Sequence, residues 1–157
     1  MSLSLNTFIL RRNAMKKLLL LFAICLTIIS CKKDIDKTLT SKTWAIESAT
    51  ITPAVTIGNK TSTNYIELMG QASCVANMMM TFSTDGTYTI GSNGALCDMA
   101  VSTDLKTWTR NGDQIILSSD RNSPMVLNGK KLTQTISLPA TSGTGYTIVY
   151  VYKAQSK

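Results

Sequence analysis

Few residues in this 157-residue chain could do acid–base or metal chemistry. Histidine is absent, which excludes Ser-His-Asp and Cys-His nucleophile pairs and histidine-ligated metals. Among the nine acidic residues, Asp98 and Asp104 are the main candidates for a carboxylate pair of the kind that hydrolyses glycosides. Nothing in their spacing requires a shared cleft. The sequence therefore predicts no catalytic residue and no cofactor, and a protein that is not an enzyme.

Three consecutive methionines, Met78, Met79 and Met80, form a second group with possible chemistry. Thioether sulfurs are soft ligands that suit Cu(I). In a strand Met78 and Met80 point to one face and Met79 to the other, so a copper site would need Met69 or Met99 to converge on the same point. Methionine is far more common as an adaptable lining of cores and pockets. We therefore expect no metal, with Met78 and Met80 in a core or a pocket wall.

The N-terminal segment has the residue pattern of a processing segment. An apolar run over Leu18–Ile29 follows Lys16 and Lys17. A run of this length suits a signal-peptide h-region of about 7–15 residues and falls short of the ~20 residues that cross a bilayer. Its end, Ile28-Ile29-Ser30-Cys31, resembles the lipobox of bacterial lipoprotein precursors. The resemblance implies that Cys31 becomes the first mature residue and carries acyl chains such as palmitate.

This interpretation divides the chain into three parts. We expect a signal peptide at 1–30, a lipidated cysteine and polar tether at 31–40, and one folded domain at 41–157. Residues 1–14 are either an over-extended start, with Met15 as the true one, or part of a long n-region. A signal peptide with a chance cysteine, or an uncleaved anchor, is the alternative. The expected location is the outer membrane, on its periplasmic or its cell-surface face.

Removing the leader changes the charge argument. The formal charge falls from +7 to +3 once the four basic residues Arg11, Arg12, Lys16 and Lys17 are removed. A basic balance that comes largely from a signal peptide is poor evidence for nucleic-acid binding. The expected partners are the membrane, through acylated Cys31, and a small apolar ligand.

Export also bears on the other cysteines. With Cys25 lost in the leader and Cys31 acylated, Cys74 and Cys97 remain as an even pair in an oxidising compartment. We predict a Cys74–Cys97 disulfide, which would stabilise the domain by about 3.5 kcal/mol in the chain-entropy model. A zinc site is the rival, but two cysteines without histidine do not make a zinc ligand set.

From Trp44 onward the chain consists of strand-forming residues. Thr, Ser, Ile, Val and Tyr dominate, and turn signals recur about every 8–12 residues, as in antiparallel barrels and sandwiches. The prediction is an all-β fold with at most one short helix. That helix spans Asn64–Gly70, with Asn64 as its cap and Gly70 as its stop.

The turn residues of one hairpin predict how its two strands pair. A three-residue loop, Thr84–Gly86, sets Phe82 opposite Tyr88 and Met80 opposite Ile90, because this pairing gathers apolar side chains on one face.

Two further turns are predicted from Asn-Gly pairs. A turn at Asn111-Gly112 sets Trp108 opposite Ile115 and Lys106 opposite Leu117, and another lies at Asn128-Gly129. In the last strand alternate residues share one face, either core-facing or an exposed aromatic platform. These are Tyr146, Ile148, Tyr150 and Tyr152.

Several of these motifs occur together in one family. The early tryptophan in Leu39–Trp44, cysteines on either side of the strand that ends in Thr81–Tyr88, and Thr107-Trp108 before the Asn-Gly turn resemble the lipocalin-like lipoproteins of Gram-negative bacteria. The resemblance covers most of residues 38–153. It implies an antiparallel up-and-down β-barrel of about eight strands, whose interior is filled by side chains or holds one small ligand.

The side chains expected on the inner face either form the core or line a pocket for an apolar molecule. The candidate ligand-binding residues are Trp44, Met78, Met80, Phe82, Tyr88 and Trp108.

The expected function is therefore a non-enzymatic, lipid-anchored envelope lipoprotein that binds a small apolar ligand. The alternative is a protein-interaction or inhibitor module that acts through the loop at 139–146 and exposed tyrosines. Ser142–Tyr146 resembles the Ser-Gly-x-x-Tyr loop of periplasmic lysozyme inhibitors, although a plain hairpin loop explains the same residues.

Overall fold

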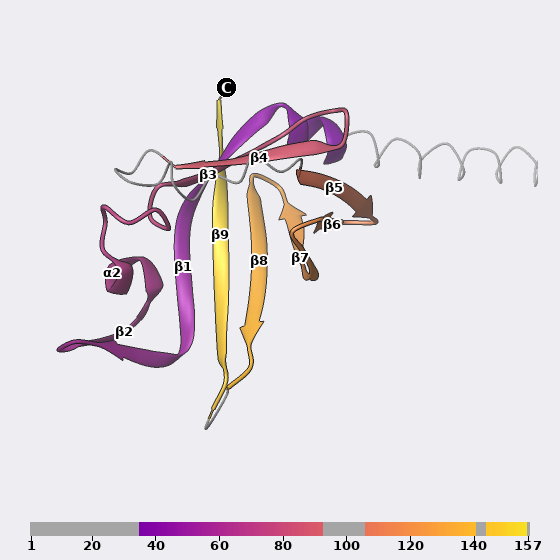
Figure 1. Ribbon diagram of the computed structural model, residues 1–157. Helices are drawn as coiled ribbons and strands as arrows, with labels where there is room; N and C mark the ends of the chain where they lie inside the picture. Colours follow the sequence, from indigo (N-terminus) through magenta and orange to yellow (C-terminus); the bar gives the residue numbers. More distant parts are fainter. Residues whose placement is uncertain (1–34, 93–105, 141–143, 157) are drawn as a thin grey trace, which may run out of the picture. The chain divides into compact units, whose positions relative to one another are not determined.

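The computed structural model describes residues 35–92, 106–140 and 144–156 (Figure 1). The chain divides into two units, Met1–Asp36 and Lys37–Lys157, and all the strands below belong to the second. The strands are β1 (Lys42–Ile57), β2 (Lys60–Asn64), β3 (Met78–Phe82), β4 (Thr87–Ser92), β5 (Lys106–Asn111), β6 (Gln114–Leu117), β7 (Asp120–Asn128), β8 (Lys131–Leu138) and β9 (Tyr146–Ser156). Two short helices occur in the described parts, at residues 35–40 and at α2 (Tyr65–Met69).

Eight of the strands close into an antiparallel barrel. From β3 to β9 each strand pairs with the next along the chain, β1 pairs with β3, and β9 pairs back onto β1 from Lys42–Ser156 to Thr52–Thr147. Because β1 pairs with both β3 and β9, the barrel has no terminal edge strand. In Figure 1, β1, β9 and β8 run side by side and β3 and β4 cross at the top. The predicted all-β barrel is confirmed.

The ninth strand lies outside this closed set. β2 pairs only with the second half of β1, from Thr50–Asn64 to Ile57–Lys60, and forms an arm with it. The chain then enters α2, where the Asn64 side chain accepts a hydrogen bond from the Glu67 amide over 3.2 Å. Gly70 follows the helix with a positive φ of 87°. The predicted cap and stop residues of this helix are confirmed.

The predicted β3–β4 hairpin is confirmed in register. Phe82 pairs with Tyr88 and Met80 with Ile90. Gly86 adopts a φ of 85°, a region that glycine enters without the steric penalty of a Cβ.

The β5–β6 hairpin differs from its predicted register. Trp108 pairs with Leu117 rather than with Ile115, because Asn111 is the last paired residue and the loop is Gly112-Asp113. Gly112 is the first loop residue, a position that requires positive φ in the favoured two-residue hairpins. Its φ of 66° meets this requirement. The predicted pairing of Lys106 with Leu117 is wrong for the same reason. The turn at Asn128-Gly129 is present, with Gly129 again first in the loop.

We call one end of the barrel the closed end, because the fully buried Leu39 and Trp44 lie where β1 begins. Here β1 begins at Lys42 and β9 finishes at Ser156, and the turns at 83–86, 112–113 and 129–130 lie at the same end because the strands alternate in direction. The opposite end carries the β1–β2 arm and the connection from β8 to β9.

The short helix at 35–40 differs from the polar tether expected for residues 31–40. Leu39 is completely buried in the hydrophobic core, and its carbonyl oxygen accepts a 3.0 Å hydrogen bond from Trp44 Nε1. The last carbonyls of a helix lack partners within the helix, so the indole satisfies one of them. The compact unit accordingly begins at Lys37, ahead of the predicted domain start at residue 41.

Candidate functional site

The six predicted ligand-binding residues lie in or against the hydrophobic core. Trp44, Met80, Phe82 and Tyr88 are at most 3% exposed, whereas Met78 and Trp108 are partly buried against them. The Phe82 ring stacks on Tyr88 at 5.8 Å and meets Trp108 edge-on at 5.9 Å. These contacts join side chains of β3, β4 and β5 in and against the hydrophobic core. Of the six, Met78 lines a crevice at the barrel surface.

A crevice in the barrel wall lies beside this core, where β1 changes partners. β1 pairs with β3 over Thr43–Ala45, and its pairing with β2 begins only at Thr50. Between them, the described strands provide Ile46, Ser48 and Ala49 with partners on the β9 side alone. A bulge between Ile46 and Ser48 leaves Glu47 as an extra residue. Such bulges bend a strand and re-aim its side chains.

The crevice has a volume of about 390 Å³. Its floor consists of the five β1 residues from Ile46 to Thr50. Its walls come from the end of β2, from α2 and from the loop that follows the helix: Thr63, Asn64, Ile66, Gln71 and Ala76.

The α2 side of the crevice is held by polar contacts. Glu67 forms an ion pair with Lys60 over 2.8 Å and accepts a hydrogen bond from Ser62 over 3.1 Å. The bond from Lys60, and then the one from Ser62, lower the pKa of the Glu67 carboxyl. These contacts fasten α2 to β2.

Hydrogen bonds also fix the loop after α2. The Asn77 amide donates to the backbone oxygens of Gln71 and Ser73, over 2.9 and 3.0 Å, and the Ala76 amide donates to Ser73 Oγ. Because Gln71 and Ala76 line the crevice, this loop gives it a preformed wall.

A smaller crevice of about 250 Å³ adjoins the first, since both are lined by Ile46 and Ala76. It continues along the junction of β1 and β3 past Met78 and Met79 to Gln155 at the end of β9.

The chemistry of the lining is mostly neutral. Hydroxyls and amides come from Ser48, Thr50, Thr63, Asn64 and Gln71, and apolar surface comes from Ile46, Ala49, Ile66 and Ala76. The one carboxylate in the lining, Glu47, is paired with Lys131 over 2.9 Å. In the described residues, no three metal-ligating side chains come together. The arrangement can hold a small neutral molecule through hydrogen bonds and apolar contacts.

Two tyrosines of β9, Tyr150 and Tyr152, lie in or against the hydrophobic core. Tyr150 meets Tyr65 of α2 edge-on at 6.3 Å and stacks on Tyr152 at 6.4 Å. Burial raises the pKa of Tyr150 to about 12 and also raises that of Tyr152. Of the three tyrosines and one isoleucine on the predicted shared face, only Tyr146 is well exposed, at 40%. The stripe therefore faces the core and is not an exposed aromatic platform.

A second groove, of about 430 Å³, lies over β5 and β6. It is lined by strand residues such as Thr107, Thr109 and Ile116, with Arg121 at its side. Its described lining includes the turn residue Ser118 but no helix residue. We take the crevice at β1 as the candidate site because α2 and the loop after it also line that crevice.

Several predicted residues lie outside the described residues. They are Cys31, Cys97 and the carboxylate candidates Asp98 and Asp104. Cys74 is described: it lies in the loop before β3, and its backbone oxygen accepts a hydrogen bond from Ser92 Oγ over 3.3 Å. The Cys74–Cys97 disulfide stays a prediction.

Comparison of the chain with protein families, curated proteins and solved structures finds no match. In the parts of the chain that are described, no helix has the length and apolar character needed to cross a membrane.

Proposed function

We propose that this chain is a non-enzymatic, lipid-anchored outer-membrane lipoprotein whose barrel binds a small, largely apolar ligand. The crevice between β1 and α2 is the observation that carries the ligand-binding part. Its volume of about 390 Å³ falls within the ~300–1,000 Å³ typical of ligand sites. Its lining combines apolar side chains with hydrogen-bonding groups, and ligand sites use both. The ligand would carry hydroxyl or amide groups that match Thr50, Asn64 and Gln71.

The anchoring part rests on the sequence. The apolar run before Ile28-Ile29-Ser30-Cys31 resembles a lipoprotein leader, and a cysteine with two or more acyl chains binds a membrane firmly. We expect Cys31→Ser to move the protein from the membrane to the soluble fraction of a Gram-negative host. Retention of the variant on the membrane would contradict the anchor.

Ligand binding is testable with the neutral fluorescent probe N-phenyl-1-naphthylamine. Ala76 lines both crevices, so Ala76→Phe would fill them, and we expect it to weaken probe binding by about tenfold or more. Ala54 is exposed on the β1–β2 arm, outside both crevices, and Ala54→Phe is the matched control. Equal probe affinity of the two variants would contradict the crevice as the site. Native mass spectrometry of the purified wild type would show a co-purified ligand.

One observation favours the alternative of a protein-interaction module. Leu138 and Tyr146 pair across β8 and β9 at the ends of the 139–145 connection, and they are 44% and 40% exposed. Paired exposed apolar side chains next to a loop suit a contact with another protein. We would expect Leu138→Ser/Tyr146→Ser to abolish a specific partner in affinity capture, and an unchanged partner would argue against this function.

A further inference from the structure

Lysines gather on the outer surface of the barrel at its closed end. Lys131 of β8 and Lys153 of β9 pair directly across the two strands, and both side chains are exposed. Lys130 precedes Lys131 in the β7–β8 turn, and its carbonyl oxygen accepts a hydrogen bond from the Ala154 amide over 3.1 Å. These three residues, Lys130, Lys131 and Lys153, are called the lysine face below.

The lysine face holds more positive charge than its surroundings neutralise. Like charges directly opposite each other on a sheet are unfavourable. Glu47, displaced by the β1 bulge, reaches across β9 to pair with Lys131 over 2.9 Å. No described acidic side chain pairs with Lys130 or Lys153. One carboxylate therefore balances one of three ammonium groups, and such a surface favours an anionic partner.

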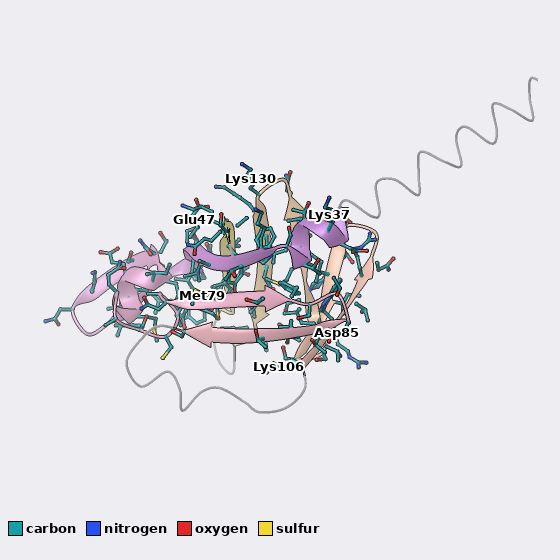
Figure 2. The ribbon with its side chains drawn as sticks, turned by 90° about the horizontal axis from the view of Figure 1, so that it is seen from above. Lys37, Glu47, Met79, Asp85, Lys106 and Lys130 are labelled. Atoms are coloured by element: carbon teal, nitrogen blue, oxygen red, sulfur yellow. The ribbon has the colours of Figure 1, made fainter. Side chains whose placement is uncertain are left out.

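The compact unit that contains the lysine face begins at the same end of the barrel. Lys37, the first residue of the compact unit, is exposed two residues before the buried Leu39 of the closed end. Figure 2 shows Lys37, Lys130 and Glu47 along one edge of the domain, with Asp85 and Lys106 along the opposite edge. Cys31 precedes Lys37 by six residues, so the chain between them spans at most ~20 Å. A membrane that holds Cys31 would lie within that reach of the closed end.

We propose that the lysine face docks on the anionic phospholipid headgroups of the membrane that holds the acylated Cys31. This inference rests on the proposed lipid anchor. A lysine close to an anionic surface strengthens binding by about fivefold. Held by its acyl chains and by this face, the barrel directs Leu138 and Tyr146, at the opposite end, away from the bilayer.

The test uses the complete acylated protein reconstituted in two kinds of vesicle. One kind contains phosphatidylcholine alone, and the other contains phosphatidylcholine mixed with phosphatidylglycerol. Lysines are acetylated with a water-soluble reagent, and the rate at each position is read by peptide mass spectrometry. We expect Lys130, Lys131 and Lys153 to react several-fold more slowly on the anionic vesicles, with the difference lost at high salt because salt screens exposed charges. Lys60 and Lys106 serve as internal controls with unchanged rates.

The two ways of failing are distinguishable in this experiment. An acylated N-terminal peptide combined with equal rates on both vesicles would overturn docking and leave the lipoprotein proposal intact. An N-terminal peptide without acyl groups would overturn the anchor and the tethered docking together. Lys130→Gln/Lys153→Gln, compared with Lys60→Gln/Lys106→Gln, gives a second measurement. On anionic vesicles, acetylation of Lys131 should be fast in the first variant and slow in the second. Slow acetylation of Lys131 in both variants would contradict the role of the lysine face.

Discussion

Trp44 Nε1 donates a 3.0 Å hydrogen bond to the carbonyl oxygen of Leu39 inside the closed end of the barrel. Both residues are completely buried. The bond joins the end of the helix at 35–40 to the start of β1, so the segment before the barrel contributes to its core. This arrangement links the stability of the domain to residues close to the proposed lipid anchor.

Leu39→Ala is expected to lower the free energy of unfolding by about 3 kcal/mol, since it removes a fully buried side chain and leaves a cavity under Trp44. Urea unfolding followed by tryptophan fluorescence measures the change. Leu138→Ala is the matched control, because Leu138 is 44% exposed and its loss should matter much less. Similar effects of the two substitutions would mean that the helix does not contribute to the core.

Gly112→Ala is expected to lower the free energy of unfolding by about 1–2 kcal/mol. Gly112 has a φ of 66°, and an added Cβ would meet no atom within 4 Å, so the effect would come from the backbone alone. Gly91→Ala is the control, since Gly91 is in a strand with equally open space and without a positive φ. Equal thermal midpoints for the two variants would contradict the positive-φ loop that sets the β5–β6 register.

The predicted and observed registers differ where the turn type was ambiguous. The loop Thr84–Gly86 allowed one pairing that buries Phe82 and Tyr88 together, so apolar patterning determined its register. At Asn111-Gly112 the alternatives differ by one residue in the position of the turn. Apolar patterning did not distinguish these two turn positions. The positive φ of Gly112 did, because it places Gly112 first in the loop.

The crevice was not predicted, although the sequence contains a trace of it. The inward-facing residues at the start of β1 are Trp44 and Ile46, and the next are Ala49 and Ile51. The spacing of three between Ile46 and Ala49 breaks the two-residue period of a regular strand, which is the pattern of a bulge. That β1 changes partners there depends on the long-range pairing with β2 and β3, which local patterning does not encode.

The helix at 35–40 was missed for a different reason. It is too short to show a helical hydrophobic period, and its one buried residue, Leu39, is explained by packing against the rest of the barrel rather than by local sequence. In contrast, the cap and stop of α2, Asn64 and Gly70, are local signals and were predicted correctly.

Alkaline pH is expected to destabilise the barrel through its buried tyrosines. Burial raises the pKa of Tyr150 from 10.0 to about 12, so the folded state keeps a proton that the unfolded state releases. The stabilisation is complete below the unfolded pKa of 10.0 and is lost as pH rises through about 12, at up to ~1.4 kcal/mol per pH unit for each such group. Urea midpoints measured across this range should fall less steeply for Tyr150→Phe than for the wild type. The same slope in both proteins would contradict the contribution of Tyr150.

The predicted Cys74–Cys97 disulfide is testable by thiol alkylation and mass spectrometry of the mature, exported protein. The hydrogen bond from Ser92 Oγ to the Cys74 carbonyl oxygen brings the end of β4 to the loop that contains Cys74. Cys97 follows Ser92 by only five residues, so the chain can return to Cys74 over a short path. We expect no alkylation of either residue without reductant, and about 3.5 kcal/mol less stability for Cys74→Ser/Cys97→Ser. The double substitution avoids an unpaired thiol. Alkylation of both residues in the native, unreduced protein would contradict the bond.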